Sequence, residues 1–134
     1  MNTAAPQSRL RTFVRYHLPL ILYSLAILLV SSIPNFRVPL VPFHGADKVA
    51  HFLEYAVFAA LCFRSFVHLS ARITRNGAFW CSVGFLLLFA LVDESVQRFT
   101  PGRQSDLVDY VTDLLGGLLV LIVLRVRNAS RTSI

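Results

Sequence analysis

Charged residues are scarce in this sequence: Asp, Glu, Lys and Arg make up only 15% of its 134 residues. Soluble globular domains usually contain about 25% charged residues. Hydrophobic residues account for 55% of the chain, and the mean hydropathy is +0.61. A chain of this length is typical of one domain. So little charge and such long apolar runs indicate a membrane protein rather than a soluble enzyme.

Cysteines are also few, since Cys62 and Cys81 are the only two and both lie in apolar runs. They do not form a disulfide framework or a metal-ligand pattern, so we expect both to serve in packing. Basic residues outnumber acidic ones by 13 to 7. No basic face is interleaved with aromatic side chains, however, so we expect no nucleic-acid partner.

The N-terminus imitates a secretory signal peptide. Arg9, Arg11 and Arg15 precede an apolar run from Leu18 to Ile33. The run is long and no clean small-residue cleavage site follows it, which favours an uncleaved first helix. The residues before this helix, 1–15, are expected to form a mobile basic segment.

Four apolar segments are predicted to be membrane-spanning helices, at about residues 16–33, 47–67, 77–96 and 105–124. Prolines exclude a helix from residues 34–46, and Pro101-Gly102 ends the third segment. Ser105 is the expected N-cap of the fourth. Spans of this length match the ~30 Å hydrocarbon core of a bilayer. The sequence thus predicts an all-α, four-transmembrane-helix bundle over residues 16–124, followed by a basic tail, 125–134.

The arginines predict the orientation of this bundle. With four spans, nine of them share one side of the membrane: Arg9, Arg11, Arg15, Arg64, Arg72, Arg75, Arg125, Arg127 and Arg131. By the positive-inside rule that side is cytoplasmic, as are both termini. The outer half then receives all seven acids: Asp47, Glu54, Asp93, Glu94, Asp106, Asp109 and Asp113. The membrane itself is therefore an expected partner, with anionic lipid headgroups at the basic tails.

Three of the predicted helices carry a polar stripe in this outer half. At 100° per residue, Lys48, His51, Glu54, Tyr55 and Phe58 fall within an arc of about 120°. On the third span, an arc of about 100° contains Asp93, Glu94 and Gln97. On the fourth span, an arc of about 80° contains Asp106, Asp109, Asp113 and Gly116. Charge that faces lipid is costly, so we expect the three stripes to converge.

The depth of Asp113 supports this convergence. It precedes Arg125 by 12 residues, which corresponds to about 18 Å of helix. A charge near the bilayer centre costs about 2.5–3.5 kcal/mol on insertion scales, so this carboxyl group needs a partner or a proton. The adjacent Gly116-Gly117 pair is expected to let the fourth span approach a neighbour closely.

The polar motifs resemble the VanZ-like family of small bacterial membrane proteins. They are Lys48-x-x-His51-x-x-x-Tyr55, Glu94-x-x-Gln97, Pro101-Gly102-Arg103-x-x-Asp106-x-x-Asp109 and Asp113-x-x-Gly116. The resemblance covers about residues 46–121, and the order and spacing of the motifs make it fairly specific. It implies a multi-pass protein of the bacterial inner membrane. The namesake of the family is linked to teicoplanin resistance.

An outward-facing polar pocket is the leading hypothesis. Its predicted lining is Lys48, His51, Tyr55, Glu94, Gln97, Arg103, Asp106, Asp109 and Asp113. Lys48, His51 and Arg103 would hold an anionic lipid or lipid-linked envelope component, and Glu94, Asp109 and Asp113 would orient these cations. Tyr55 and Gln97 would hydrogen-bond neutral groups. No catalytic residue, metal or cofactor is assigned.

Two other functions stay open. A membrane enzyme acting on a lipid-linked phosphate or on a glycosyl or acyl lipid would use His51 or Glu94 as general base. An assembly subunit would turn its polar groups toward a protein partner. The same residues are also consistent with structural roles: a packing network around His51, an ion-pair clasp between Glu94 and Arg103, and helix N-terminal charge at Asp106.

Overall fold

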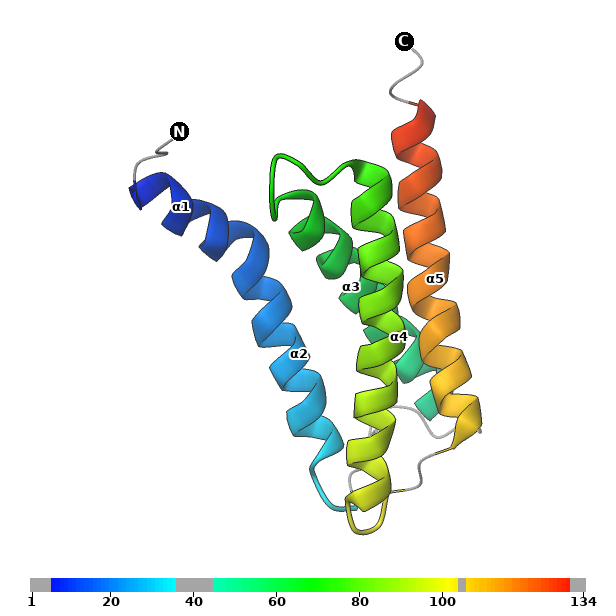
Figure 1. Cartoon of the computed structure of the whole chain (residues 1–134). Coiled ribbons are helices and arrows are strands. Elements are labelled where there is room, and N and C mark those ends of the chain that lie inside the picture. The colour runs from blue at the N-terminus through cyan, green and yellow to red at the C-terminus, as the bar shows by residue number, and fades with distance from the viewer. Residues whose placement is uncertain (1–5, 36–44, 104–105, 131–134) are drawn as a thin grey trace.

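The computed structural model of the chain describes residues 6–35, 45–103 and 106–130. These ranges contain helices and no strand. The helices are α1 (Pro6–Thr12), the π-helical turn η1 (Phe13–His17), α2 (Leu18–Ser31), α3 (Ala46–Val67), α4 (Arg75–Phe99) and α5 (Leu107–Ser130). The first three follow one another as a single bent rod beside the other helices (Figure 1).

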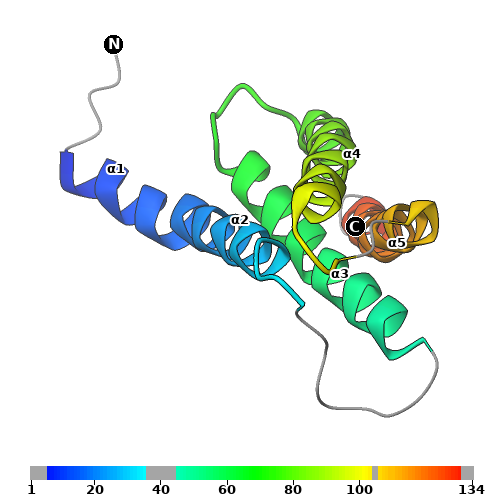
Figure 2. The same cartoon turned by 90° about the horizontal axis from the view of Figure 1, so that it is seen from below.

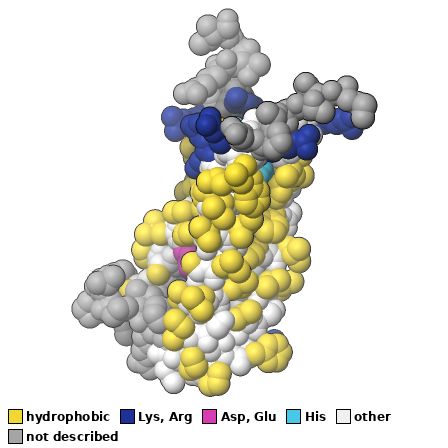
Figure 3. Space-filling view, turned by 90° about the vertical axis from the view of Figure 1, so that its left-hand side faces the viewer, with side chains coloured by type: hydrophobic (Ala, Val, Ile, Leu, Met, Phe, Trp, Pro, Cys, Tyr) yellow, Lys and Arg dark blue, Asp and Glu magenta, His cyan; other side chains and the backbone are white. Residues whose placement is uncertain are grey.

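Four helical stretches are long and apolar enough to cross a membrane: Ser8–Ser31, Ala46–Val67, Arg75–Phe99 and Leu107–Arg127. The shortest has 21 residues, about 32 Å of helix, which matches the ~30 Å hydrocarbon core. Apolar side chains are spread over much of the face of the bundle that Figure 3 shows. The prediction of an all-α bundle with four membrane-spanning helices is confirmed.

The first span begins earlier than predicted, because residues 6–15 are helical rather than mobile. Leu10, Phe13 and Val14 extend the apolar run, and no proline interrupts it before Pro19. A proline cannot donate the backbone hydrogen bond to the carbonyl four residues earlier, here that of Arg15. The chain forms a π-helical turn at this point, and Arg64 Nη2 donates to the Arg15 oxygen at 2.6 Å.

The predicted limits of the later spans also shift outward. α4 runs to Phe99 rather than residue 96, and α5 continues to Ser130, through most of the expected tail. Its arginines do not break the helix, because they lie on exposed positions of the last turns. Most of the proline-containing loop and the expected N-cap Ser105 lie outside the described residues.

Helices α3, α4 and α5 form the core of the bundle (Figures 1 and 2). A Cβ atom on Gly116 would lie 2.2 Å from the backbone oxygen of Phe52, and one on Gly117 would lie 2.6 Å from Leu86. The two glycines thus face α3 and α4 respectively. The expectation that this pair permits close helix contact is confirmed.

The bundle has a basic end and an acidic end. At the basic end lie the start of α1, the α3–α4 turn and the end of α5, together with their arginines, which Figure 3 shows in dark blue. Arg131 is outside the described residues. At the acidic end, the backbone N–H of Asn35 donates to the Pro101 oxygen at 3.2 Å and so joins the end of α2 to the α4–α5 turn. This acidic end contains the predicted polar stripes.

Candidate binding site at the acidic end of the bundle

Two pairs of a nitrogen-bearing side chain with an aspartate join α3 to α5. Lys48 forms an ion pair with Asp109, and Nδ1 of His51 lies 2.9 Å from Oδ1 of Asp113. The pairs lie about one helical turn apart, because His51 follows Lys48 by three residues and Asp113 follows Asp109 by four. In both pairs the nitrogen-bearing side chain is the more exposed: 31% against 7% in the first and 14% against 0% in the second.

A second polar centre surrounds Asp93 on α4, whose side chain is fully buried. Its Oδ1 accepts a hydrogen bond from Ser31 at 2.5 Å, and its Oδ2 accepts from the Tyr55 hydroxyl at 3.1 Å and from Gln97 at 3.2 Å. The donors come from α2, α3 and α4. Charge-assisted bonds of this kind both satisfy the buried carboxylate and fix the three helices relative to one another.

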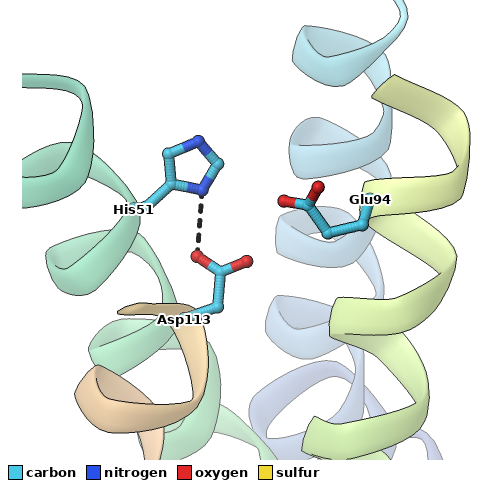
Figure 4. A group of neighbouring side chains, drawn as sticks. All are labelled: His51, Glu94 and Asp113. Atoms are coloured by element: carbon cyan, nitrogen blue, oxygen red, sulfur yellow. Dashed lines mark hydrogen bonds and ion pairs between the residues drawn. The ribbon is translucent and has the colours of Figure 1, made fainter. Parts of the chain in front are cut away.

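Glu94 lies next to the His51–Asp113 pair. One ligand-type atom from each of these three residues lies within 4.8 Å of the others. The carboxyl group of Glu94 extends from α4 toward the pair (Figure 4). Glu94 and Asp113 are buried and His51 is nearly so. The three stripes therefore meet between α3, α4 and α5, as the sequence predicted.

Asp106 differs from the other predicted site residues because it is exposed. Its Oδ1 accepts a hydrogen bond from the backbone N–H of Val108 at 3.2 Å, so it caps the start of α5. Asp109 and Asp113 instead contact Lys48 and His51. The three aspartates thus have separate contacts, and Asp106 lies apart from the other two residues of the predicted lining.

Arg103 follows the Pro101-Gly102 turn and is partly buried. Gly102 has a φ of 74°, a conformation that side chains rarely adopt, and its position against Asn35 leaves no room for a Cβ atom. This turn fixes the direction in which the chain leaves α4, and hence the position of the Arg103 backbone from which the side chain extends. Arg103 therefore lies at the acidic end of the bundle, in the connection between α4 and α5.

Two residues of this region were absent from the predicted site, Asp93 and Ser31. Asp93 shares the polar arc of Glu94 and Gln97, so its inward direction was visible in the sequence. Ser31 was not visible in this way, because a serine in an apolar run commonly bonds its own helix, as Ser24 does to the Leu20 oxygen. Its role depends on where α2 meets α4.

Most of the chain matches a known protein family. A family model described as VanZ/LLP1 matches residues 3–128. The chain belongs to the VanZ/LLP1 family. No curated protein and no solved structure matches it. The resemblance inferred from the polar motifs is confirmed, and the matched segment is longer than residues 46–121. It includes the first span, whose Ser31 completes the Asp93 centre.

Proposed function

We propose that this VanZ-like membrane protein binds the anionic, phosphate-bearing headgroup of a lipid or lipid-linked envelope component at the acidic end of its bundle. The main support for this proposal is the unequal exposure of the two side chains in each pair that joins α3 and α5. In each pair the nitrogen-bearing side chain is more exposed than its carboxylate. A headgroup that approaches the site would therefore meet Lys48 and His51 before Asp109 and Asp113.

The carboxylates have a definite part in this proposal. Asp109 holds Lys48 and Asp113 holds His51 in fixed positions, so that less side-chain freedom is lost when a ligand binds. Arg103, in the α4–α5 connection, has a planar guanidinium group that can donate two parallel hydrogen bonds to a phosphate. Tyr55 and Gln97 act through Asp93, since both donate to its Oδ2 atom. We assign them a positioning role instead of ligand contact.

Native mass spectrometry of gently solubilised protein tests this proposal. The wild type is expected to retain an adduct with the mass of a phosphate-bearing lipid, and Arg103→Ala is expected to lose it. Arg72→Ala is the matched control, because it removes an exposed arginine from the basic end. Bare protein in every sample would contradict the proposal. Aggregation of Arg103→Ala together with unchanged binding by Lys48→Ala would favour a structural clasp instead.

A second candidate function is catalysis on such a lipid, with His51 as the general base. The observation that favours it is the hydrogen bond from His51 to Asp113 beside a second carboxyl group, Glu94. A histidine oriented by a carboxylate is a common arrangement for proton transfer. In the same spectra, a bound lipid that loses mass with time in the wild type and stays intact in His51→Ala would establish turnover.

We extend the proposal to antibiotic susceptibility through the family. A protein that binds a lipid-linked precursor in the bacterial inner membrane would change how much of it glycopeptides encounter. Expression of the wild type in a susceptible host is expected to raise the inhibitory concentration of teicoplanin, and expression of Arg103→Ala is not. Equal inhibitory concentrations for wild type and empty vector would separate this protein from resistance and leave its lipid binding to be tested alone.

A further inference from the structure

We infer that His51, Glu94 and Asp113 form a binding site for one divalent transition-metal ion between α3, α4 and α5, with Zn²⁺ as the reference ion. This goes beyond the proposed lipid binding and does not depend on it. It also differs from our expectation from the sequence, which assigned no metal. The stripes predicted that these side chains would converge, but not which atoms would meet.

The geometry of the three side chains suits a small cation. Their ligand-type atoms lie within 4.8 Å of one another, and each comes from a different helix. Zn²⁺ binds nitrogen and oxygen at about 2.0–2.2 Å, so the ligand atoms of a tetrahedral site lie about 3.3 Å apart. The nitrogen and oxygen of His51 and Asp113 are already 2.9 Å apart. The carboxyl group of Glu94 points toward this pair in Figure 4, and its closer approach would complete the set.

Asp113 supplies an independent indication that a ligand belongs here. Its Oδ1 contacts His51, whereas its Oδ2 is buried and has no hydrogen-bond partner among the described residues. The side chain as a whole is 0% exposed. A buried polar atom without a partner destabilises the folded protein. Coordination of a metal ion by Oδ2 would remove this destabilisation.

Charge and ligand chemistry select the class of ion. With a metal ion bound, His51 is a neutral ligand, so this imidazole and the two carboxylates together carry a charge of −2, which a divalent cation neutralises; burial makes such neutralisation important. Lys48, the nearest cation on α3, is held by Asp109. Carboxylates alone would suit Mg²⁺ or Ca²⁺, but an imidazole ligand favours Zn²⁺ and its first-row neighbours. Three protein ligands leave one position open for water or a phosphate oxygen.

Metal content tests this inference directly. Tag-free, full-length protein in detergent would be equilibrated with buffered Zn²⁺, without added lipid, and its metal measured by plasma mass spectrometry after gel filtration. The wild type is expected to retain about one Zn²⁺ per chain. His51→Ala and Glu94→Gln are expected to bind at least about tenfold more weakly, because even changes around a ligand cost 10–100-fold. His68→Ala, an exposed histidine at the basic end, should equal the wild type.

The outcomes separate this inference from the proposed lipid binding, since no lipid enters the experiment. Monodisperse wild-type protein without bound Zn²⁺ would overturn the metal site, whatever the lipid experiments give. If a variant aggregates, X-ray absorption of the zinc-loaded wild type decides. One imidazole with oxygen ligands supports the site. Sulfur ligands, which would indicate Cys62 or Cys81, or several imidazoles, would overturn it.

Discussion

Ser31, the last residue of α2, donates a hydrogen bond of 2.5 Å to Asp93 on α4. The first span has few other buried contacts. Only 11% of the residues in its most apolar stretch are buried within the protein, against 28–39% for the other three spans. The hydroxyl of Tyr23 adds a 3.2 Å bond to the backbone oxygen of Glu54 on α3. These two polar bonds attach α2 to α3 and α4, in addition to the few apolar side chains, such as Ile27, that α2 buries in the core.

Ser31→Ala is expected to destabilise the folded protein by about 1–2 kcal/mol, because it removes a buried bond to a charged acceptor. Unfolding can be followed by the reaction of the buried Cys62 with a maleimide dye, in a background where the exposed Cys81 is replaced by serine. Ser32→Ala is the control, since the Ser32 hydroxyl donates to the Leu28 oxygen of its own helix. Equal midpoints for the two variants would show that the Asp93 bond does not stabilise the first span.

Gly116→Ala is expected to force α5 away from α3. The added methyl group would lie 2.2 Å from the Phe52 oxygen, and a backbone atom cannot move aside cheaply. Overpacking of this kind costs about 1–3 kcal/mol. Gly84→Ala in α4 provides the comparison, because a Cβ atom there has nothing within 4 Å. The same dye assay should give a lower midpoint only for Gly116→Ala; a lower midpoint for Gly84→Ala alone would contradict the helix packing described above.

The Lys48–Asp109 pair is expected to contribute a measurable coupling energy. Asp109 is almost fully buried, so solvent screens the pair less than it would screen a surface ion pair. In a cycle of Lys48→Met, Asp109→Asn and the double variant, the expected coupling is about 1 kcal/mol or more. If the destabilisation of the double variant equals the sum of the two single variants, the two side chains do not act as a pair. Asp109 would then not position Lys48.

The arginine distribution predicts the orientation of the bundle. In a background without native cysteines, Asn76→Cys would mark the start of α4 at the basic end and Pro101→Cys the α4–α5 turn at the acidic end; both positions are exposed. An impermeant maleimide added to intact spheroplasts should label position 101, and label position 76 only after permeabilisation. The reverse pattern would place the candidate site on the cytoplasmic face.

The sequence predicted the convergence of the polar residues because two features were sufficient. Helical periodicity placed the polar side chains on one face of each span, and the cost of lipid-facing charge turned those faces inward. The glycine pair likewise indicated a close contact. Asp106 was assigned to the site because it shares an arc with Asp109. Only the structure shows that α5 begins at Leu107 and leaves Asp106 outside as a cap.

Specific partners could not be predicted in this way. That Asp113 pairs with His51, and that Asp93 accepts from Ser31, depends on the rotation and vertical offset of packed helices. Sequence periodicity gives the face of one helix but not its register against a neighbour. The helix over residues 6–15 was missed for a local reason, since three arginines obscured the apolar residues between them.

Two lipids that differ only in the headgroup test whether the acidic end of the bundle recognises phosphate. Wild-type protein in nanodiscs would be offered a polyprenyl phosphate and the matching polyprenol, and the bound fraction of each would be measured. Recognition of the phosphate by the cations of the acidic end predicts at least about tenfold tighter binding of the phosphate, or about 1.4 kcal/mol. This preference should disappear in Arg103→Ala. Equal affinity for the phosphate and the alcohol would contradict the recognition of phosphate at the acidic end of the bundle.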